Sequence, residues 1–200
     1  MKTLLSTFAI ILSLHAGAQE CSVQNSEKYQ QNLNAEYADP AKSPLLKADL
    51  ATFKALDLYP IDMEYCVEAK LVRTPNEKPF KMPTTGNRKP MYVKYGELNF
   101  TLTGKAFKLD VFQSLDMAKL DEYKDHLFLP FTDLTSGNGS YGGGRYIDLK
   151  VPKGDTIIID FNTAYNPYCA YNHGYSCPIT PKQNDIDTAV KAGVKDYVRH

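Results

Sequence analysis

The sequence predicts a mainly β protein: an antiparallel sandwich or barrel of about seven strands with short flanking helices at both ends. Two observations predict this class. From about residue 61 onward, short runs alternate apolar and polar residues; in residues 65–71, Glu68 and Lys70 face away from the apolar side chains. Glycine and proline separate these runs at short intervals, and this spacing is typical of sandwiches and barrels.

The size and charge of the chain limit its organisation and its partners. With 200 residues, 43% of them hydrophobic, it is long enough for one well-buried domain. The 23 basic residues balance the 23 acidic ones, so nothing favours a nucleic-acid or anionic-membrane partner. We predict a signal peptide over residues 1–18, a helical segment over 19–60 packed on the main body, and a β-domain over 61–200 with a long loop at 161–180.

The N-terminus has the pattern of a secretory signal peptide. Lys2 precedes an apolar run over residues 4–14, and small residues at 16–18 predict cleavage before Gln19. The alternative is a short buried helix. No later segment approaches 18 apolar residues, so we expect no transmembrane segment in the mature chain. The protein is therefore expected to be periplasmic or extracellular; lipid anchoring at Cys21 is disfavoured because Glu20 precedes it, where lipoprotein processing requires a small residue.

Four cysteines in an exported chain are most simply two disulfides, and four cysteines allow three pairings. Cys169 and Cys177 lie in one loop, so we predict a disulfide between them that closes a short ring. Cys21 and Cys66 then remain as the second pair.

Helices are predicted near both ends of the chain. In residues 22–38, Tyr29, Leu33 and Tyr37 recur every four residues, which places them on one helix face that docks against the main body. Ser43 and Pro44 predict the start of a second helix that continues to about residue 56. Near the C-terminus, we predict a short helix over residues 186–192, capped by the preceding aspartate and ended by a glycine.

The strands are predicted in three groups. After the strand over residues 65–71 comes an edge strand at 80–82. Residues 91–114 predict a meander of three strands with turns at Gly96 and Gly104. Further strands are expected at residues 126–131, 145–149 and 156–161.

Three motifs stand close together in the last third of the chain. They are YGGGRY at residues 141–146, DFNTAYNP at 160–167, and Cys169 followed by Cys177-Pro178. This combination resembles the domain-of-unknown-function family 1684, found in bacteria and archaea, over nearly the whole mature chain. The resemblance implies no activity. In that family the loop cysteines also occur in members without an export signal, which leaves a reduced, functional pair open.

The motifs also predict a polar ligand site. Consecutive glycines before Arg145 free backbone amides, which with the guanidinium would bind an anion or carboxylate. The alternative is that Arg145 pairs internally with Asp133 or Asp160. Asp160 and Asn162 end a strand, where binding groups are often placed, but they are also ordinary turn formers. The full predicted site is Asp133, Tyr141, Arg145, Asp160, Asn162 and Tyr165.

The loop at 161–180 contains further residues that could bind a ligand or a metal. Its tyrosines suit stacking against a sugar, an aromatic group or a peptide, although such residues also pack long loops onto a sheet. His173 lies midway between the two loop cysteines, but a metal site would need a fourth ligand and reduced thiols. We therefore predict no metal and no cofactor.

The favoured function is an exported β-domain that binds a small or extended ligand. The alternatives are a hydrolase or thiol enzyme using Cys169 or Asp160, and a structural envelope protein.

Overall fold

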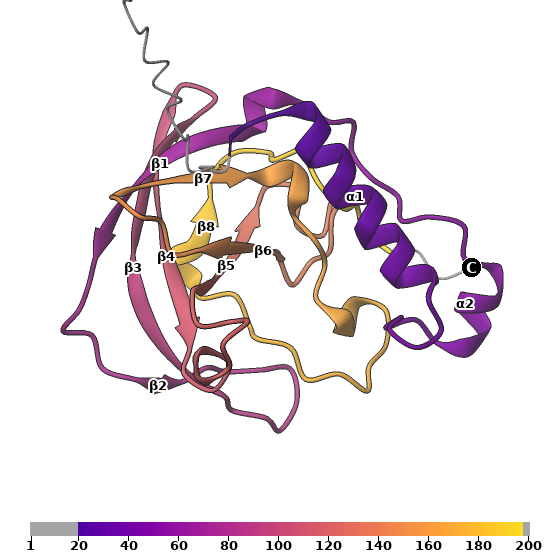
Figure 1. Cartoon of the computed structure of the whole chain (residues 1–200). Helices are drawn as coiled ribbons and strands as arrows, with labels where there is room; N and C mark the ends of the chain where they lie inside the picture. The colour runs from indigo at the N-terminus through magenta and orange to yellow at the C-terminus, as the bar shows by residue number, and fades with distance from the viewer. Residues whose placement is uncertain (1–19, 198–200) are drawn as a thin grey trace, which may run out of the picture.

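The computed structural model describes residues 20–197, so the predicted signal peptide lies outside the described residues. The protein is mainly β, as predicted: eight strands form one curled sheet with short helices beside it (Figure 1). The strands are β1 Cys66–Arg73, β2 Phe80–Lys81, β3 Met91–Leu102, β4 Lys105–Ser114, β5 His126–Asp133, β6 Arg145–Lys150, β7 Thr156–Asp160 and β8 Asp185–Ile186.

The sheet runs in the order β6-β5-β4-β3-β1-β7, and neighbouring strands in this order are antiparallel. Short β2 pairs with β3, and β8 lies parallel to β5. At the ends of the order, Tyr146 of β6 exchanges both backbone hydrogen bonds with Tyr165, five residues beyond β7. The chain that follows one edge strand therefore pairs with the other edge strand, and this curls the sheet into a half-barrel.

The inside of the curl is the hydrophobic core. Alternate residues of β1, β3, β4, β5, β6 and β7 meet there, and Phe131 and Phe161 pack edge to face with their ring centroids 5.2 Å apart. Both rings are fully buried. Because burial of apolar surface contributes about 25 cal/mol per Å², this cluster is the main source of stability.

The N-terminal helix α1 (Val23–Ala38) follows the prediction closely. Ser22 caps it by accepting a hydrogen bond from the Asn25 amide, and Asp39 ends it. Tyr37 is fully buried in a second cluster beside the sheet, which also holds Tyr171. A disulfide between Cys21 and Cys66 ties the start of α1 to the first residue of β1. Within residues 20–197, no helix is both long and apolar enough to cross a bilayer.

Residues 91–114 form two long strands, so the predicted three-strand meander was wrong. The tight turn at Gly104 is confirmed: Thr103 and Gly104 both have positive φ, as a two-residue hairpin of type I′ requires. Gly96, however, lies within β3 at a register shift. A Cβ there would lie 2.7 Å from both the Leu71 side chain and the Val72 carbonyl oxygen. The glycine thus permits close approach of two strands rather than a turn.

The predicted C-terminal helix over residues 186–192 is also absent, because Asp185 and Ile186 pair with β5 instead. Just before them, the buried Asn184 amide bonds both backbone groups of Asp110 on β4 and the Pro130 carbonyl on β5. These contacts tie the tail to the sheet as an extended segment.

The second helix, α2 (Lys47–Thr52), begins four residues after the predicted cap Ser43, which instead accepts from the Leu45 amide. The short 3-10 helices are η1 Met63–Tyr65, η2 Met117–Lys119, η3 Phe161–Thr163, η4 Tyr168–Ala170 and η5 Lys182–Asn184.

Candidate functional site

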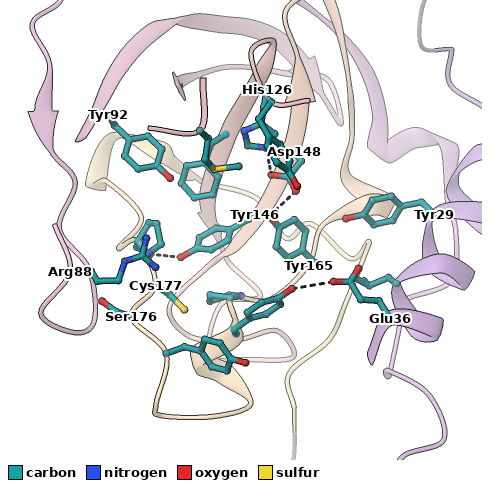
Figure 2. Close-up of a pocket in the computed structure, with 18 residues that line it drawn as sticks. Tyr29, Glu36, Arg88, Tyr92, His126, Tyr146, Asp148, Tyr165, Ser176 and Cys177 are labelled. Atoms are coloured by element: carbon teal, nitrogen blue, oxygen red, sulfur yellow. Dashed lines mark hydrogen bonds and ion pairs between the residues drawn. The ribbon is translucent and has the colours of Figure 1, made fainter. Parts of the chain in front are cut away.

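A cavity of 430 Å³ lies where α1, β3, β5, β6 and the loop over residues 165–178 meet (Figure 2). We call it the aromatic pocket, because eight of its 18 lining residues are tyrosine or phenylalanine. The rings belong to Tyr29, Tyr92, Tyr123, Phe128, Tyr146, Tyr165, Tyr168 and Tyr175. The polar side chains among them are Glu36, Arg88, His126, Asp148 and Ser176. The volume suits a small organic ligand.

Strand alternation places a polar cluster on the pocket wall. Tyr146 and Asp148 share one face of β6, and His126 and Phe128 share the same face of the neighbouring β5. Asp148 accepts from His126 Nε2 at 2.9 Å and from the Tyr165 hydroxyl, also at 2.9 Å. Both oxygens of this carboxylate therefore have partners, and the imidazole is held in one orientation.

Two polar groups of the pocket have no protein partner among residues 20–197. The Nδ1 atom of His126 is buried and makes no hydrogen bond. Because Asp148 accepts from Nε2, Nδ1 of the neutral ring is an acceptor. The guanidinium of Arg88, on the exposed loop between β2 and β3, has neither a hydrogen bond nor an ion pair within the described part of the chain. Figure 2 shows Arg88 and His126 on different sides of Tyr146.

Three tyrosines of the pocket, Tyr29, Tyr165 and Tyr168, remain neutral at physiological pH because their pKa values are raised. Burial, together with the charge of Glu36, raises the pKa of Tyr168 to about 12. Burial and then Asp148 raise the pKa of Tyr29, and the same two causes raise the pKa of Tyr165. Their hydroxyls are therefore available as hydrogen-bond groups; that of Tyr168 donates to Glu36 at 3.3 Å.

Cys169 and Cys177 are free thiols in this structure, so the predicted disulfide between them is not formed. The crosslink of the chain joins the other pair, Cys21 and Cys66. The loop thiols nevertheless lie together: the Cys169 amide donates to the Cys177 sulfur at 3.2 Å, and the Tyr141 hydroxyl lies 3.7 Å from the Cys169 sulfur. Cys177 lines the aromatic pocket.

Arg145 and Asp133 form a buried ion pair, the internal alternative to the predicted anion site. A guanidinium nitrogen lies 2.7 Å from the Asp133 carboxylate, and neither side chain has any solvent exposure. The guanidinium also donates to the carbonyls of Val190, Ala192 and Val194. It therefore holds the C-terminal segment against β5 and β6, where a ligand cannot reach it.

Asp160 and Asn162 belong to a separate buried network. Asp160 accepts from the Ser26 hydroxyl of α1 at 2.6 Å and from the Asn162 amides. Asn162 in turn bonds both backbone groups of Asp62. These contacts fasten α1 and η1 to the end of β7, so Asp160 is held in structural hydrogen bonds.

Of the six predicted site residues, Tyr165 lines the pocket, whereas Tyr141 does not line it and lies against Cys169. Sequence reasoning missed Glu36, Arg88, His126 and Asp148. The signal for two of them was present: Asp148 occupies a solvent-facing position between buried residues of β6, and His126 begins a strand. Arg88 lies in a proline-rich turn segment that carried no such pattern.

Comparisons with known proteins place the chain in a family without assigning an activity. No protein of curated function matches it. The solution NMR structure of an uncharacterised protein from gene locus rrnAC0354 of Haloarcula marismortui is similar, with a TM-score of 0.69 and 31% identity over 88% of this chain and 95% of that chain. The model of the family described as protein of unknown function (DUF1684) matches residues 51–195. The chain therefore belongs to the DUF1684 family.

Proposed function

We propose that this protein is an exported ligand-binding β-domain whose site is the aromatic pocket. The ligand is a small ring-bearing acid that also carries a hydroxyl or amine. One observation carries the proposal: Arg88 and His126 line a tyrosine-rich cavity, and neither the Arg88 guanidinium nor the buried His126 Nδ1 has a partner among the described residues.

The two unpartnered groups define the ends of the ligand. A guanidinium binds carboxylates through paired N–H donors, so an acidic group belongs at Arg88. The acceptor Nδ1 of His126 requires a donor, which a hydroxyl or an amine supplies. A buried polar atom without a partner is costly, and a ligand that satisfied it would remove that cost.

The walls define the middle of the ligand. Tyr146 and Tyr165 meet edge to face, with ring centroids 5.8 Å apart, and Phe128 packs edge to face on Tyr146. Such rings present flat apolar surfaces with hydroxyl tips, which suit a sugar or an aromatic ring. Sugar acids and hydroxylated aromatic acids both combine a ring, an acidic group and a donor.

The pocket also favours binding over a purely structural role. The polar groups of the two buried networks, Arg145 with Asp133 and Asp160 with Asn162, are bonded to other parts of the chain. In the pocket, Asp148 and Glu36 also have protein partners, but the Arg88 guanidinium and the buried His126 Nδ1 have none among the described residues.

Arg88→Ala tests the ligand assignment. We expect sugar acids or hydroxylated aromatic acids to raise the melting temperature of the wild type, whereas their amides do so less. Calorimetric titration should then show about tenfold to 100-fold weaker binding of the acid to Arg88→Ala, the usual value of a charge-assisted hydrogen bond. The matched control is Lys89→Ala, because Lys89 is the exposed neighbouring cation outside the pocket.

Equal losses in Arg88→Ala and Lys89→Ala would contradict the assignment of the acidic group. A panel of sugar acids and aromatic acids that leaves the melting temperature unchanged at millimolar concentration would contradict the proposal itself.

Export is supported by residues 1–18 and by the Cys21–Cys66 disulfide, because disulfides persist in oxidising compartments. That bond also occupies the sulfur that a lipid anchor would need. Expression of the full chain in a bacterium should therefore yield, outside the cytoplasm, a protein that begins at Gln19 without added lipid mass. Retention in the cytoplasm with Met1 in place would contradict export, and an acylated Cys21 would contradict the soluble form.

A further inference from the structure

Cys169 and Cys177 form a pair with unequal surroundings. Cys169 lies in η4 (Tyr168–Ala170), and its amide donates to the Cys177 sulfur at 3.2 Å. The Cys177 amide in turn donates to the Thr85 hydroxyl at 3.1 Å. These bonds keep the two sulfurs together although the residues are eight positions apart in a loop.

The contacts of Cys169 favour its thiolate. The hydrogen bond from the Cys177 thiol lowers the pKa of Cys169 to about 6, and the hydroxyls of Tyr141 and Thr85 act in the same direction against burial. The hydrogen bond to Cys169 and burial raise the pKa of Cys177. One thiol is therefore a nucleophile at neutral pH, and the other remains protonated beside it.

One member of the pair, Cys177, lines the aromatic pocket, and Cys169 lies directly beside it. Each cysteine is only 7% exposed, but Cys177, Ser176 and Pro178 form part of the pocket wall. A small disulfide could therefore enter where a protein could not.

We propose that Cys169 and Cys177 form a dithiol site that undergoes thiol–disulfide exchange with a small disulfide entering through the aromatic pocket. The Cys169 thiolate attacks one sulfur of the small disulfide, whose S–S bond breaks and releases one thiolate. Cys177 then loses its proton to solvent and attacks the Cys169 sulfur, which releases the second thiolate. Two protein thiols are oxidised to one disulfide, and the small disulfide is reduced to two thiols. The site does not depend on the ligand proposed above.

The first experiment treats the protein, with its Cys21–Cys66 bond intact, with oxidised glutathione. We expect two titratable thiols before treatment and none after it, with a loss of 2 Da and a Cys169–Cys177 crosslink in the peptide map. Cys177→Ser should stop at one glutathione adduct on Cys169. Cys169→Ser should react at least about tenfold more slowly, because the remaining thiol is protonated.

Glutathione adducts that persist on the wild type without a crosslink would overturn the proposal, as would equal rates for the two single variants. A second measurement needs no serine variant: the rate of alkylation of the native protein by iodoacetamide against pH. We expect a midpoint at about pH 6, shifted upward in Tyr141→Phe because that variant loses a hydrogen bond to the thiolate. A midpoint at about pH 8.5, the ordinary value for a thiol, would overturn the assignment of Cys169 as the nucleophile.

Discussion

Replacement of Arg145 by methionine is expected to lower the free energy of unfolding by about 3–5 kcal/mol, because it leaves the Asp133 carboxylate buried without its cation. The variant also loses the donors to the carbonyls of Val190, Ala192 and Val194. Urea unfolding followed by circular dichroism measures the loss. Arg145→Lys, which retains the charge but not the planar fork, should lose less.

The matched control for this prediction is Arg88→Met. It removes the same type of side chain from an exposed position without a protein partner, so its free energy of unfolding should change by no more than about 0.5 kcal/mol. Similar losses in both variants would show that the Arg145 network does not carry the stability assigned to it.

The double variant Cys21→Ala, Cys66→Ala should lose about 4 kcal/mol, the chain-entropy value for a closed loop of this size. The bond spans 45 positions and joins the N-terminus of α1 to β1, so its removal frees a long segment of the unfolded chain. Urea midpoints of the two proteins under non-reducing conditions measure the loss.

Reducing agent provides the control for this second prediction. It should destabilise the wild type by a similar amount and leave the double variant unchanged, because that variant has no crosslink to reduce. A wild type that is indifferent to reduction would contradict the prediction.

Local sequence patterns predicted much of the fold, because the spacing of apolar side chains in helices and strands depends on neighbouring residues in the chain. The spacing of Tyr29, Leu33 and Tyr37 located α1 almost to the residue. Alternation located the strands, but Gly96 was misread, because its close contact with β1 depends on a partner strand that local sequence does not reveal. The prediction of a C-terminal helix over residues 186–192 was wrong for the same reason, because the start of this segment pairs with β5.

The site was less predictable than the fold. Glycines beside Arg145 indicated an exposed anion site, yet the guanidinium is buried on Asp133 and on carbonyls from the C-terminal segment. The aromatic pocket is built from α1, three strands and three connecting segments that are distant in sequence. The abundance of tyrosine in the loop was visible in the sequence; which tyrosines face a cavity, and that Arg88 joins them, depends on how the sheet curls.

The curl of the sheet has a consequence for motion. Tyr146 and Tyr165 hold the two margins of the sheet together through their amides and carbonyls, and the same two residues supply rings to the pocket. A ligand bound against these two rings would stabilise the backbone pairing between Tyr146 and Tyr165. The two edges of the sheet could then separate only after the ligand dissociates. We therefore expect the amides of Tyr146 and Tyr165 to exchange their hydrogens more slowly in the ligand-bound protein than in the free protein.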